Sequence, residues 1–392
     1  MSMSDISLNN IMLDKVELIP ILSNCAISRK PISEISQMLN EAATDDDSGN
    51  IFMRMFYIFS AMGQNESALD MQVVALENRS IYRIVSPEVT SIRLLALMGP
   101  GDMSDNTPID YLIENSDIRL DLLFISDEGD LPHSIPDHDV AFIALGESDK
   151  NNPLLERIRK LLLMWPRPFI NHPDKIKNCA RHKLPDILKN IPGLLVPKTV
   201  RVCRENLGEC RFPITIRPID THSGIGFEKL DNFNELKVYL ANSVNTEFYV
   251  SEFIDYQSTD GNYRKLRIAL IDRKPYICHQ AISEQWMVHY MSSGMELSEF
   301  KRKEEQWVME NFDLDFALRH GAALFAIAER FELDYVVIDC AQSKDGELIL
   351  FEVDPRCWVH ATDSVEIFPY KLLVMQKVFN AFRNLLLKKS SV

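Results

Sequence analysis

The sequence predicts a mixed α/β and α+β fold built from three parts in chain order. Residues 1–85 carry apolar residues at helical spacing, residues 86–171 alternate apolar strands with helices, and residues 172–392 contain several strand hairpins. A chain of 392 residues with 46% hydrophobic and 25% charged residues can bury two or three ordinary cores. We therefore expect a helical subdomain, a small parallel α/β domain and a larger α+β domain, divided near residues 85 and 171.

Net charge and cysteine content indicate which partners and which cellular compartment to expect. The net charge of −15 argues against nucleic-acid binding as the main function. Seven cysteines without a C-x-x-C pair fit a reducing compartment, so we expect a cytoplasmic protein. The start "MSMSDISLNN" has no basic or apolar segment of a secretion signal, and no apolar run approaches the roughly 20 residues of a membrane span. We expect neither nucleic-acid nor membrane partners.

The first part reads as one helical hairpin. Residues 50–64 and 66–85 both have apolar residues three and four apart, and Gly63 between them is a helix stop. The hairpin is faintly similar to a tetratricopeptide unit, but a single unit cannot form a solenoid. We interpret it as an appended helical subdomain.

The second part reads as a small parallel sheet. Strands are expected in "SIRLLAL", "RLDLLFIS", "HDVAFIALG" and "PFINHP", and helices in "NTPIDYLIENSD", with Thr107 as N-cap and Pro108 at the first position, and in "NPLLERIRKLLLMW". The turn "GPGD" follows the first strand, where such sheets bind ligands. A lone glycine turn is more often only a turn.

A glycine-containing loop follows the strand "FPITIRP" in the third part. Arg217 ends that strand, and Ser223, Gly224 and Gly226 lie in the loop before a return strand. Glycines one residue apart allow a close backbone approach and can direct N–H groups at phosphate oxygens. Many ordinary hairpins contain the same pattern, although an arginine within "ITIRPI" is hard to bury without a partner.

Three carboxylates are expected to converge on the last hairpin. In "LDYVVIDCAQSKDGELILFEVDP" the Asp345-Gly346 pair signals a tight turn, which can bring Asp339 beside Glu352. Glu352 and Asp354 are two residues apart and therefore face the same side of their strand. Oxygen ligands of this kind suit Mg²⁺ shared with phosphates. The alternative is a solvated strand end in which Asp354 caps the turn at Pro355.

The order of these motifs resembles the ATP-grasp superfamily from about residue 172 to 388, nearest to the glutathione synthetase and ribosomal-protein glutamate ligase type. The resemblance implies an ATP-grasp fold of two α+β subdomains that enclose ATP, at 172–255 (lid) and 256–392 (metal-binding). Residues 86–171 would be the preceding α/β domain.

The resemblance also implies an ATP site. Lys183 in "RHKL" matches a family lysine, and "THSGIGF" matches the loop that covers the phosphates. Arg217 stands where the family has lysine, and these side chains are not interchangeable at a phosphate. The implied nucleotide-binding residues are Lys183, Arg217, Ser223, Gly224, Gly226 and the adenine-binding strand Ser251, Glu252, Phe253 and Ile254.

The remaining matches concern metal and substrates. Arg267 matches a catalytic arginine, although Lys265 replaces the acid that precedes it in the family. Metal ligands would be Asp339, Glu352 and Asp354, the last in place of asparagine, holding two Mg²⁺ ions for which Mn²⁺ can substitute. The substrate candidates are His279, His289, Tyr290 and Arg356. Each of these histidines is individually more often a core or surface residue, and Lys183 is as easily a helix side chain with a solvated head.

The function implied by the resemblance is an ATP- and Mg²⁺-dependent carboxylate–amine ligase. It would form an amide through an acyl phosphate, with release of ADP, on an amino acid, peptide or small metabolite. A small-molecule kinase on the same scaffold is the first alternative. The second is a catalytically silent nucleotide-binding module that recruits a partner. The family resemblance makes a homodimer possible.

Overall fold

The computed structural model describes residues 8–9, 40, 47–222 and 224–391. Three sheets of four or five strands organise this part of the chain, and a short parallel pairing joins β1 (Leu8–Asn9) to β5 (Ile135–Pro136). The mixed α/β and α+β class that the sequence predicts is confirmed. Ser223, one of the expected loop residues, lies outside the described residues.

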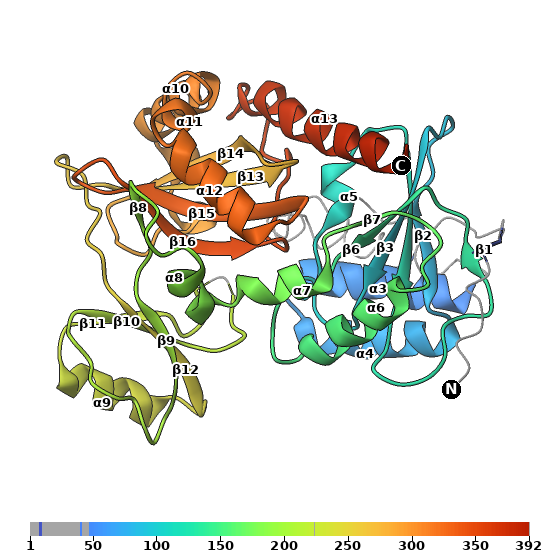
Figure 1. Cartoon of the computed structure of the whole chain (residues 1–392), viewed down its shortest axis with the longest axis horizontal. Coiled ribbons are helices and arrows are strands. Elements are labelled where there is room, and N and C mark those ends of the chain that lie inside the picture. The colour runs from blue at the N-terminus through green and yellow to red at the C-terminus, as the bar shows by residue number, and fades with distance from the viewer. Residues whose placement is uncertain (1–7, 10–39, 41–46, 223, 392) are drawn as a thin grey trace.

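The first sheet has the order β2-β4-β3-β6-β7 and is parallel except for β2 at its edge. Strands β3, β4 and β6 are almost wholly buried, as expected of apolar runs covered on both faces. Figure 1 shows α3, α4 and α6 on one side of the sheet and α5 and α13 on the other. The strands are β2 (Ile81–Val85), β3 (Ile92–Met98), β4 (Ile118–Phe124), β6 (Val140–Ile143) and β7 (Phe169–Ile170), and the helices are α3 (Ser48–Ala61), α4 (Asn65–Asn78), α5 (Ile109–Leu112), α6 (Asn152–Leu162) and α13 (Lys371–Ser390).

Three local expectations in this region need correction. Residues 81–85 form a strand and not the end of a helix, because "IYRIV" is rich in β-formers and Arg83 pairs with the buried Asp121 of β4 at 2.7 Å. Helices α3 and α4 share one hydrophobic core with the sheet, so the described part of residues 1–85 is not a separate helical body. Thr107 is not the cap of α5, since its hydroxyl lies 3.1 Å from the carbonyl oxygens of both Ala144 and Pro355, either of which can accept its proton.

The second sheet is antiparallel, with the order β11-β10-β12-β9 and helix α9 (Phe233–Asn242) against it (Figure 1). Ile216, Leu236 and Phe248 are central to a small core that contains no residue of the other sheets. The second sheet can therefore move as a unit with little loss of apolar contact elsewhere. Its strands are β9 (Thr199–Cys203), β10 (Ile214–Pro218), β11 (Glu228–Leu230) and β12 (Glu247–Glu252).

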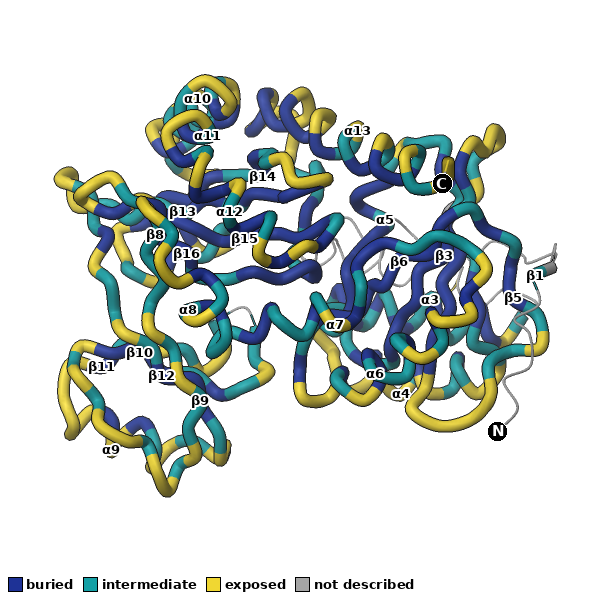
Figure 2. Tube along the Cα trace, viewed as in Figure 1, coloured by how far each residue is buried: buried dark blue, intermediate teal, exposed yellow. Residues whose placement is uncertain are grey.

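The third sheet has the order β14-β13-β15-β16-β8, antiparallel except for β8. Its core is continuous with that of the first sheet, and α13 contacts both sheets. Figure 2 shows dark, buried trace along these strands and a mostly exposed or half-buried second sheet. The strands are β8 (Leu194–Leu195), β13 (Tyr263–Ile271), β14 (Lys274–Ser283), β15 (Tyr335–Gln342) and β16 (Leu348–Asp354), and the α-helices after β14 are α10 (Glu299–Asn311), α11 (Phe316–Arg319) and α12 (Gly321–Phe331).

Short helices connect the first sheet to the other two. Three of their residues, Ile176, Cys179 and Leu184, belong to the large core, so this segment is fixed to the first and third sheets. No helix in the described ranges is both long and apolar enough to cross a lipid bilayer. The connecting elements are α7 (Pro173–Ile176), η1 (Lys177–Cys179), η2 (Arg181–Lys183) and α8 (Leu184–Ile187), and two further short helices, η3 (Tyr290–Ser292) and η4 (Met295–Leu297), precede α10.

Candidate functional site

The hairpin β15–β16 pairs Asp339 directly with Glu352, which is the register that the Asp-Gly turn predicted. Asp339 has both oxygens engaged by cations. Arg267 Nε donates to Oδ1 at 2.8 Å and Nη2 to Oδ2 at 3.1 Å, and Lys265 Nζ lies 3.0 Å from Oδ2. Burial would raise the pKa of Asp339, but the charges of Arg267 and Lys265 prevail and hold it well below its ordinary value. Asp339 is therefore a buried anion shared by two cations.

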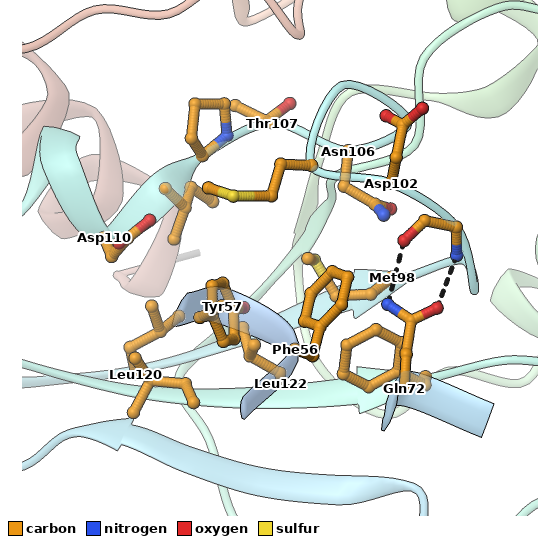
Figure 3. Close-up of a pocket in the computed structure, with 16 residues that line it drawn as sticks. Phe56, Tyr57, Gln72, Met98, Asp102, Asn106, Thr107, Asp110, Leu120 and Leu122 are labelled. Carbon is orange, nitrogen blue, oxygen red and sulfur yellow. Dashed lines mark hydrogen bonds between the residues drawn. The ribbon is translucent and has the colours of Figure 1, made fainter. Parts of the chain in front are cut away.

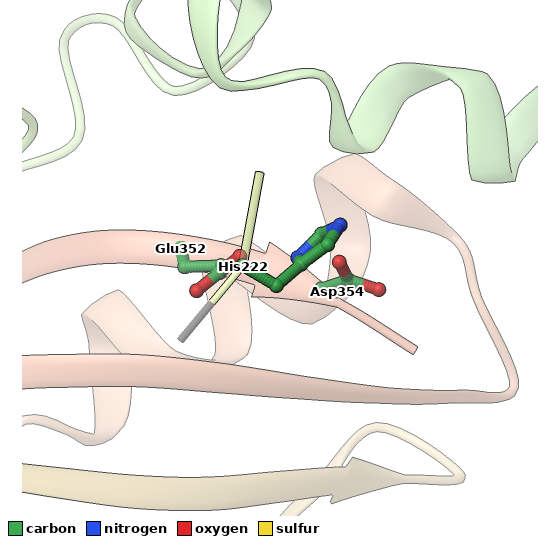
Figure 4. Close-up of side chains that lie close together, drawn as sticks. All are labelled: His222, Glu352 and Asp354. Atoms are coloured by element: carbon green, nitrogen blue, oxygen red, sulfur yellow. The ribbon is translucent and has the colours of Figure 1, made fainter. Parts of the chain in front are cut away.

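Glu352 and Asp354 lie on the same face at the end of β16, as expected, and each has an arginine partner. Arg181 of η2 pairs with Glu352. Arg356 pairs with Asp354, with Nη2 2.8 Å from Oδ2 and Nε 3.0 Å from Oδ1. His222, from the loop between β10 and β11, completes the group (Figure 4). One ligand atom from each of His222, Glu352 and Asp354 can be chosen so that all three lie within 4.8 Å of one another.

These side chains line a cavity where the three sheets meet. Glu147 follows β6 of the first sheet, Tyr249 is on β12 of the second, and Glu352 is on β16 of the third. Burial, with Asp220 nearby, raises the pKa of Glu147 to about 6. The lining consists of Glu147, Cys179, Arg181, Asp220, His222, Tyr249, Glu352, Asp354 and Arg356.

Arg356 occupies a close-fitting site between the first and third sheets. A Cβ on Gly146 would lie 1.8 Å from Arg356 Nε, so only glycine leaves room for the guanidinium. Arg356 Nη2 donates to the carbonyl of Glu147 at 2.9 Å. Its Nη1 is buried and has no hydrogen-bond partner among the described residues. Because a buried donor without a partner is costly, this atom is suited to an anionic ligand in the cavity.

Arg217 is half-buried at the end of β10 and contacts the glycine loop. Its guanidinium donates to the Thr221 carbonyl and lies 5.4 Å from the Phe227 ring centre. Burial, together with repulsion from Arg181, lowers the pKa of Arg217 to about 9. Gly224 and Gly226 have positive φ angles of 79° and 62°, a conformation that explains glycine at both positions.

The other expected nucleotide-binding residues have contacts within the protein. Lys183 Nζ donates to the Lys177 carbonyl at 2.8 Å. Ser251 Oγ is 2.9 Å from Thr199 Oγ1. The backbone N–H groups of Glu252 and Phe253 donate to Lys198 and Pro213, at 3.0 and 3.3 Å. The half-buried Ile254 packs against the cluster that contains Tyr256.

The aromatic segment expected to contact substrate divides into two environments. His279 is half-buried on β14, with its ring centre 4.5 Å from that of Tyr290, and desolvation lowers its pKa well below the ordinary value. Tyr290 belongs to a buried network, since its hydroxyl contacts Lys371 and lies 3.4 Å from Glu305. These contacts fit a packing role for both residues. Burial, together with the charges of Lys265 and Arg267, lowers the pKa of His289.

The "GPGD" turn is fixed by a helix. The side-chain amide of Gln72 on α4 accepts from the Gly101 N–H at 2.7 Å and donates to the Gly101 carbonyl at 2.9 Å. A mostly apolar pocket lies between this turn, α3, α4 and the first sheet (Figure 3). Asp110 lines it, and burial raises the pKa of that carboxyl to about 6. The turn thus does not line the cavity that contains Glu352.

Sequence reasoning missed several residues of this site. Arg181 is two residues before Lys183, and His222 is inside the predicted loop, so both were within recognised motifs. Their role depends on long-range contacts with β16 that local patterns do not contain. Glu147 and Asp220 were missed for the same reason.

Comparisons with known proteins give distant similarities of structure and none of sequence. No family model matches the chain, and no curated protein matches it. D-alanine–D-alanine ligase from Bacillus anthracis, in complex with ATP, aligns over 76% of this chain and 97% of its own, with 12% identity and a TM-score of 0.46. VanG D-Ala:D-Ser ligase from Enterococcus faecalis aligns over 75% and 99%, with 13% identity and a TM-score of 0.46. A RimK domain ATP-grasp protein from Sphaerobacter thermophilus aligns over 75% and 99%, with 14% identity and a TM-score of 0.43. Each of these alignments covers about three quarters of this chain.

Proposed function

We propose that this chain is an ATP-dependent carboxylate–amine ligase whose reaction takes place in the cavity at the junction of the three sheets. The observation that supports this best is the convergence of charge on the end of β16. Glu352 and Asp354 face arginines from two separate segments, Arg181 and Arg356, beneath a glycine-containing loop. Mixed cations and carboxylates around a glycine loop suit a nucleotide polyphosphate together with a metal ion.

The cations would hold the phosphates. Arg267 is positioned by both oxygens of Asp339, and Arg217 is positioned by the Thr221 carbonyl. Fixed guanidinium groups in a buried site stabilise the charge that develops during phosphoryl transfer without reorganising. Arg356, through its free Nη1, would bind a substrate carboxylate or a phosphate oxygen.

Glu352 and Asp354 fit a divalent metal, because they supply oxygen ligands on one face of one strand. When bound, such a metal would screen the phosphates and polarise the transferred phosphoryl group. Asp339 fits this role less well, since two cations, Lys265 and Arg267, share it, whereas Glu352 and Asp354 each have one arginine partner.

The proposed reaction has two steps. An oxygen of the substrate carboxylate attacks the terminal phosphorus of ATP, and the bond to the bridging oxygen breaks to release ADP. The nitrogen of an amine then attacks the acyl carbon, phosphate leaves with the bonding electrons, and the amine proton passes to phosphate or solvent. The described residues would orient the reactants and exclude water, and we assign no fixed general base.

A catalytically silent nucleotide-binding module is the second candidate. The observation that favours it is that Asp339, Glu352 and Asp354 each have a cationic partner within the chain. A site with its carboxylates neutralised in this way can bind a nucleotide without turning it over.

A substrate screen separates these functions. Purified protein would be incubated with ATP, divalent metal and pools of amino acids and small acids, each with and without added amines, and ADP and product masses would be measured. A ligase requires both an acid and an amine for ADP release, and it yields an amide. ADP release with a phosphorylated product and no amine requirement would identify a kinase. ATP binding without ADP release in any pool would identify the silent module. The variant Glu352→Gln/Asp354→Asn is the control for contaminating ATPases.

A further inference from the structure

The loop between β10 and β11 brings a histidine to the place where a third metal ligand is needed. His222 and the carboxylates of Glu352 and Asp354 offer ligand atoms that all lie within 4.8 Å of one another (Figure 4). Neither imidazole nitrogen of His222 has a recorded hydrogen bond to another described residue, so both remain available.

Asp339 does not complete the same group. Its Oδ1 is 2.8 Å from Arg267 Nε, and its Oδ2 is within 3.1 Å of both Arg267 and Lys265. One carboxylate shared by two cations leaves a local excess of positive charge, which repels a divalent ion at close range. Asp339 therefore serves better as the anchor of two phosphate-facing cations than as a metal ligand.

A second observation points to a ligand in the same cavity. Arg356 is 94% buried, and its Nη1 has no hydrogen-bond partner among the described residues although the side chain lines this cavity. A metal would bind the ligand atoms of His222 and the two carboxylates, and a phosphate beside it would accept a hydrogen bond from Arg356 Nη1.

We propose that His222, Glu352 and Asp354 together bind one divalent metal, without Asp339, and that the site prefers Mn²⁺ or Co²⁺ to Mg²⁺. The preference follows from the donor set, because imidazole nitrogen suits transition metals whereas Mg²⁺ takes oxygen ligands. This inference deepens the proposed function and rests on it for the role of the metal. Metal binding itself is independent of turnover.

The proposed site also connects two bodies of the protein. His222 is attached to β10 and β11 of the second sheet, whereas Glu352 and Asp354 are on β16 of the third. A metal bound to all three would hold the loop against the third sheet. We therefore expect metal to protect the loop from proteolysis even without nucleotide.

The test is direct metal binding to the full chain without substrates. Mn²⁺ would be titrated into protein with and without ADP and followed by the loss of the free-ion signal in electron paramagnetic resonance, and Mg²⁺ would be measured by competition. His222→Ala should weaken Mn²⁺ binding by at least about 10-fold, since even a residue that only supports a metal ligand contributes about 10–100-fold. Asp339→Asn, in folded protein, should change the Mn²⁺ affinity by less than about twofold. His222→Asn, which offers an oxygen, should reduce the preference for Mn²⁺ over Mg²⁺.

A spectroscopic measurement keeps the test independent of folding in the variants. Pulsed electron paramagnetic resonance of Mn²⁺ bound to the unaltered protein should detect coupling to a ¹⁴N nucleus, and this coupling should be lost in His222→Ala. Lack of Mn²⁺ binding in both the free and ADP-bound protein would overturn the proposal. So would bound Mn²⁺ without nitrogen coupling, or weakening by Asp339→Asn but not by His222→Ala in folded variants. Failure of the ligase assay alone would leave these measurements unaffected, so the two proposals fail separately.

Discussion

Asp339 and Glu352 are directly paired across β15 and β16, yet they bind cations from different parts of the chain. Asp339 is held by Lys265 and Arg267 of the neighbouring strand β13, whereas Glu352 is held by Arg181 from the segment that leaves the first sheet. Asp339 thus positions cations within the third sheet, whereas Glu352 connects the third sheet to the segment that follows the first sheet. The two positions should respond differently to mutation.

Asp339→Asn should strongly destabilise the protein. The change leaves Lys265 and Arg267 partly buried without their anion, and loss of one partner of a buried ion pair costs about 3–5 kcal/mol. Urea unfolding gives the free energy directly. The control is Asp313→Asn, which breaks an exposed ion pair with Lys377 and should cost less than about 1 kcal/mol. Equal losses in both variants would contradict the anchoring role of Asp339.

Arg181→Gln should tighten metal binding in the absence of nucleotide. Arg181 now competes with any cation for Glu352, so its removal leaves the carboxylate free. An affinity increase of roughly fivefold corresponds to about 1 kcal/mol for a partly exposed pair, measurable by Mn²⁺ titration. Arg159→Gln, which breaks a pair with Glu156 on the surface of α6, should leave metal affinity unchanged. Weaker metal binding in Arg181→Gln would mean that the arginine supports the site.

Gly146→Ala should displace Arg356. The new Cβ would lie 1.8 Å from Nε and 2.0 Å from Cδ of that side chain, a clash that only movement can relieve. Overpacking of this kind costs about 1–3 kcal/mol, and we also expect loss of substrate-dependent ADP release. Gly321→Ala is the matched control, because nothing lies within 4 Å of its added Cβ. If Gly146→Ala and Gly321→Ala had the same melting temperature and activity, the close fit of Arg356 would have no consequence.

Local sequence patterns predicted the strands and the hairpin register but not the contacts that close the site. Alternation and the Asp345-Gly346 turn were sufficient to pair Asp339 with Glu352, because both signals lie within one hairpin. The fit of Arg356 against Gly146 joins positions from two different sheets, and no local pattern contains such a distance. Residues 81–85 were mistaken for helix because the open edge of β4, which pairs with them, is a tertiary feature.

Asp149→Ala should loosen the second sheet without unfolding the protein. Asp149 accepts two hydrogen bonds from Arg201 of β9, at 2.8 and 2.6 Å, and its N–H donates to Asp220 at 3.0 Å. The Arg201 pair is partly exposed, so its loss should cost less than about 1 kcal/mol. The second sheet has its own core. We expect faster proteolysis between β10 and β11 at an unchanged melting temperature.

The control for this change is Asp315→Ala, which removes an exposed ion pair with Arg319 of α11, a helix between strands of the third sheet. It should affect neither proteolysis of the loop nor melting. Identical cleavage patterns in Asp149→Ala and the unaltered protein would indicate that other contacts hold the second sheet in place.

Glu147 should make stability depend on pH in the mildly acidic range. Burial, with Asp220 nearby, raises its pKa from an ordinary value of 4.5 to about 6, so the folded protein holds a proton that the unfolded chain releases. Its contribution is therefore greatest below pH 4.5, declines as pH rises towards about 6, and is constant above that. The rise in pKa corresponds to at most about 2 kcal/mol, and less because the side chain is partly exposed. Arg356, Asp354 and Lys183 also face this carboxyl and modulate the shift.

Glu147→Gln tests this assignment, because glutamine keeps the volume and hydrogen-bonding capacity of the protonated acid without titrating. Urea unfolding at half-unit intervals from pH 4 to pH 7.5 should show a fall in the stability of the unaltered protein relative to that of the variant between about pH 4.5 and pH 6. Above pH 6 the variant should be the more stable of the two, since it avoids an ionised carboxylate beside Asp220. The matched control is Glu156→Gln on the surface of α6, whose carboxyl has a lowered pKa through its bond with Arg159, so it should not remove the fall. Parallel stability profiles for Glu147→Gln and the unaltered protein would assign the titration to another group. Asp110 is the first candidate, because burial raises its pKa to about 6 as well.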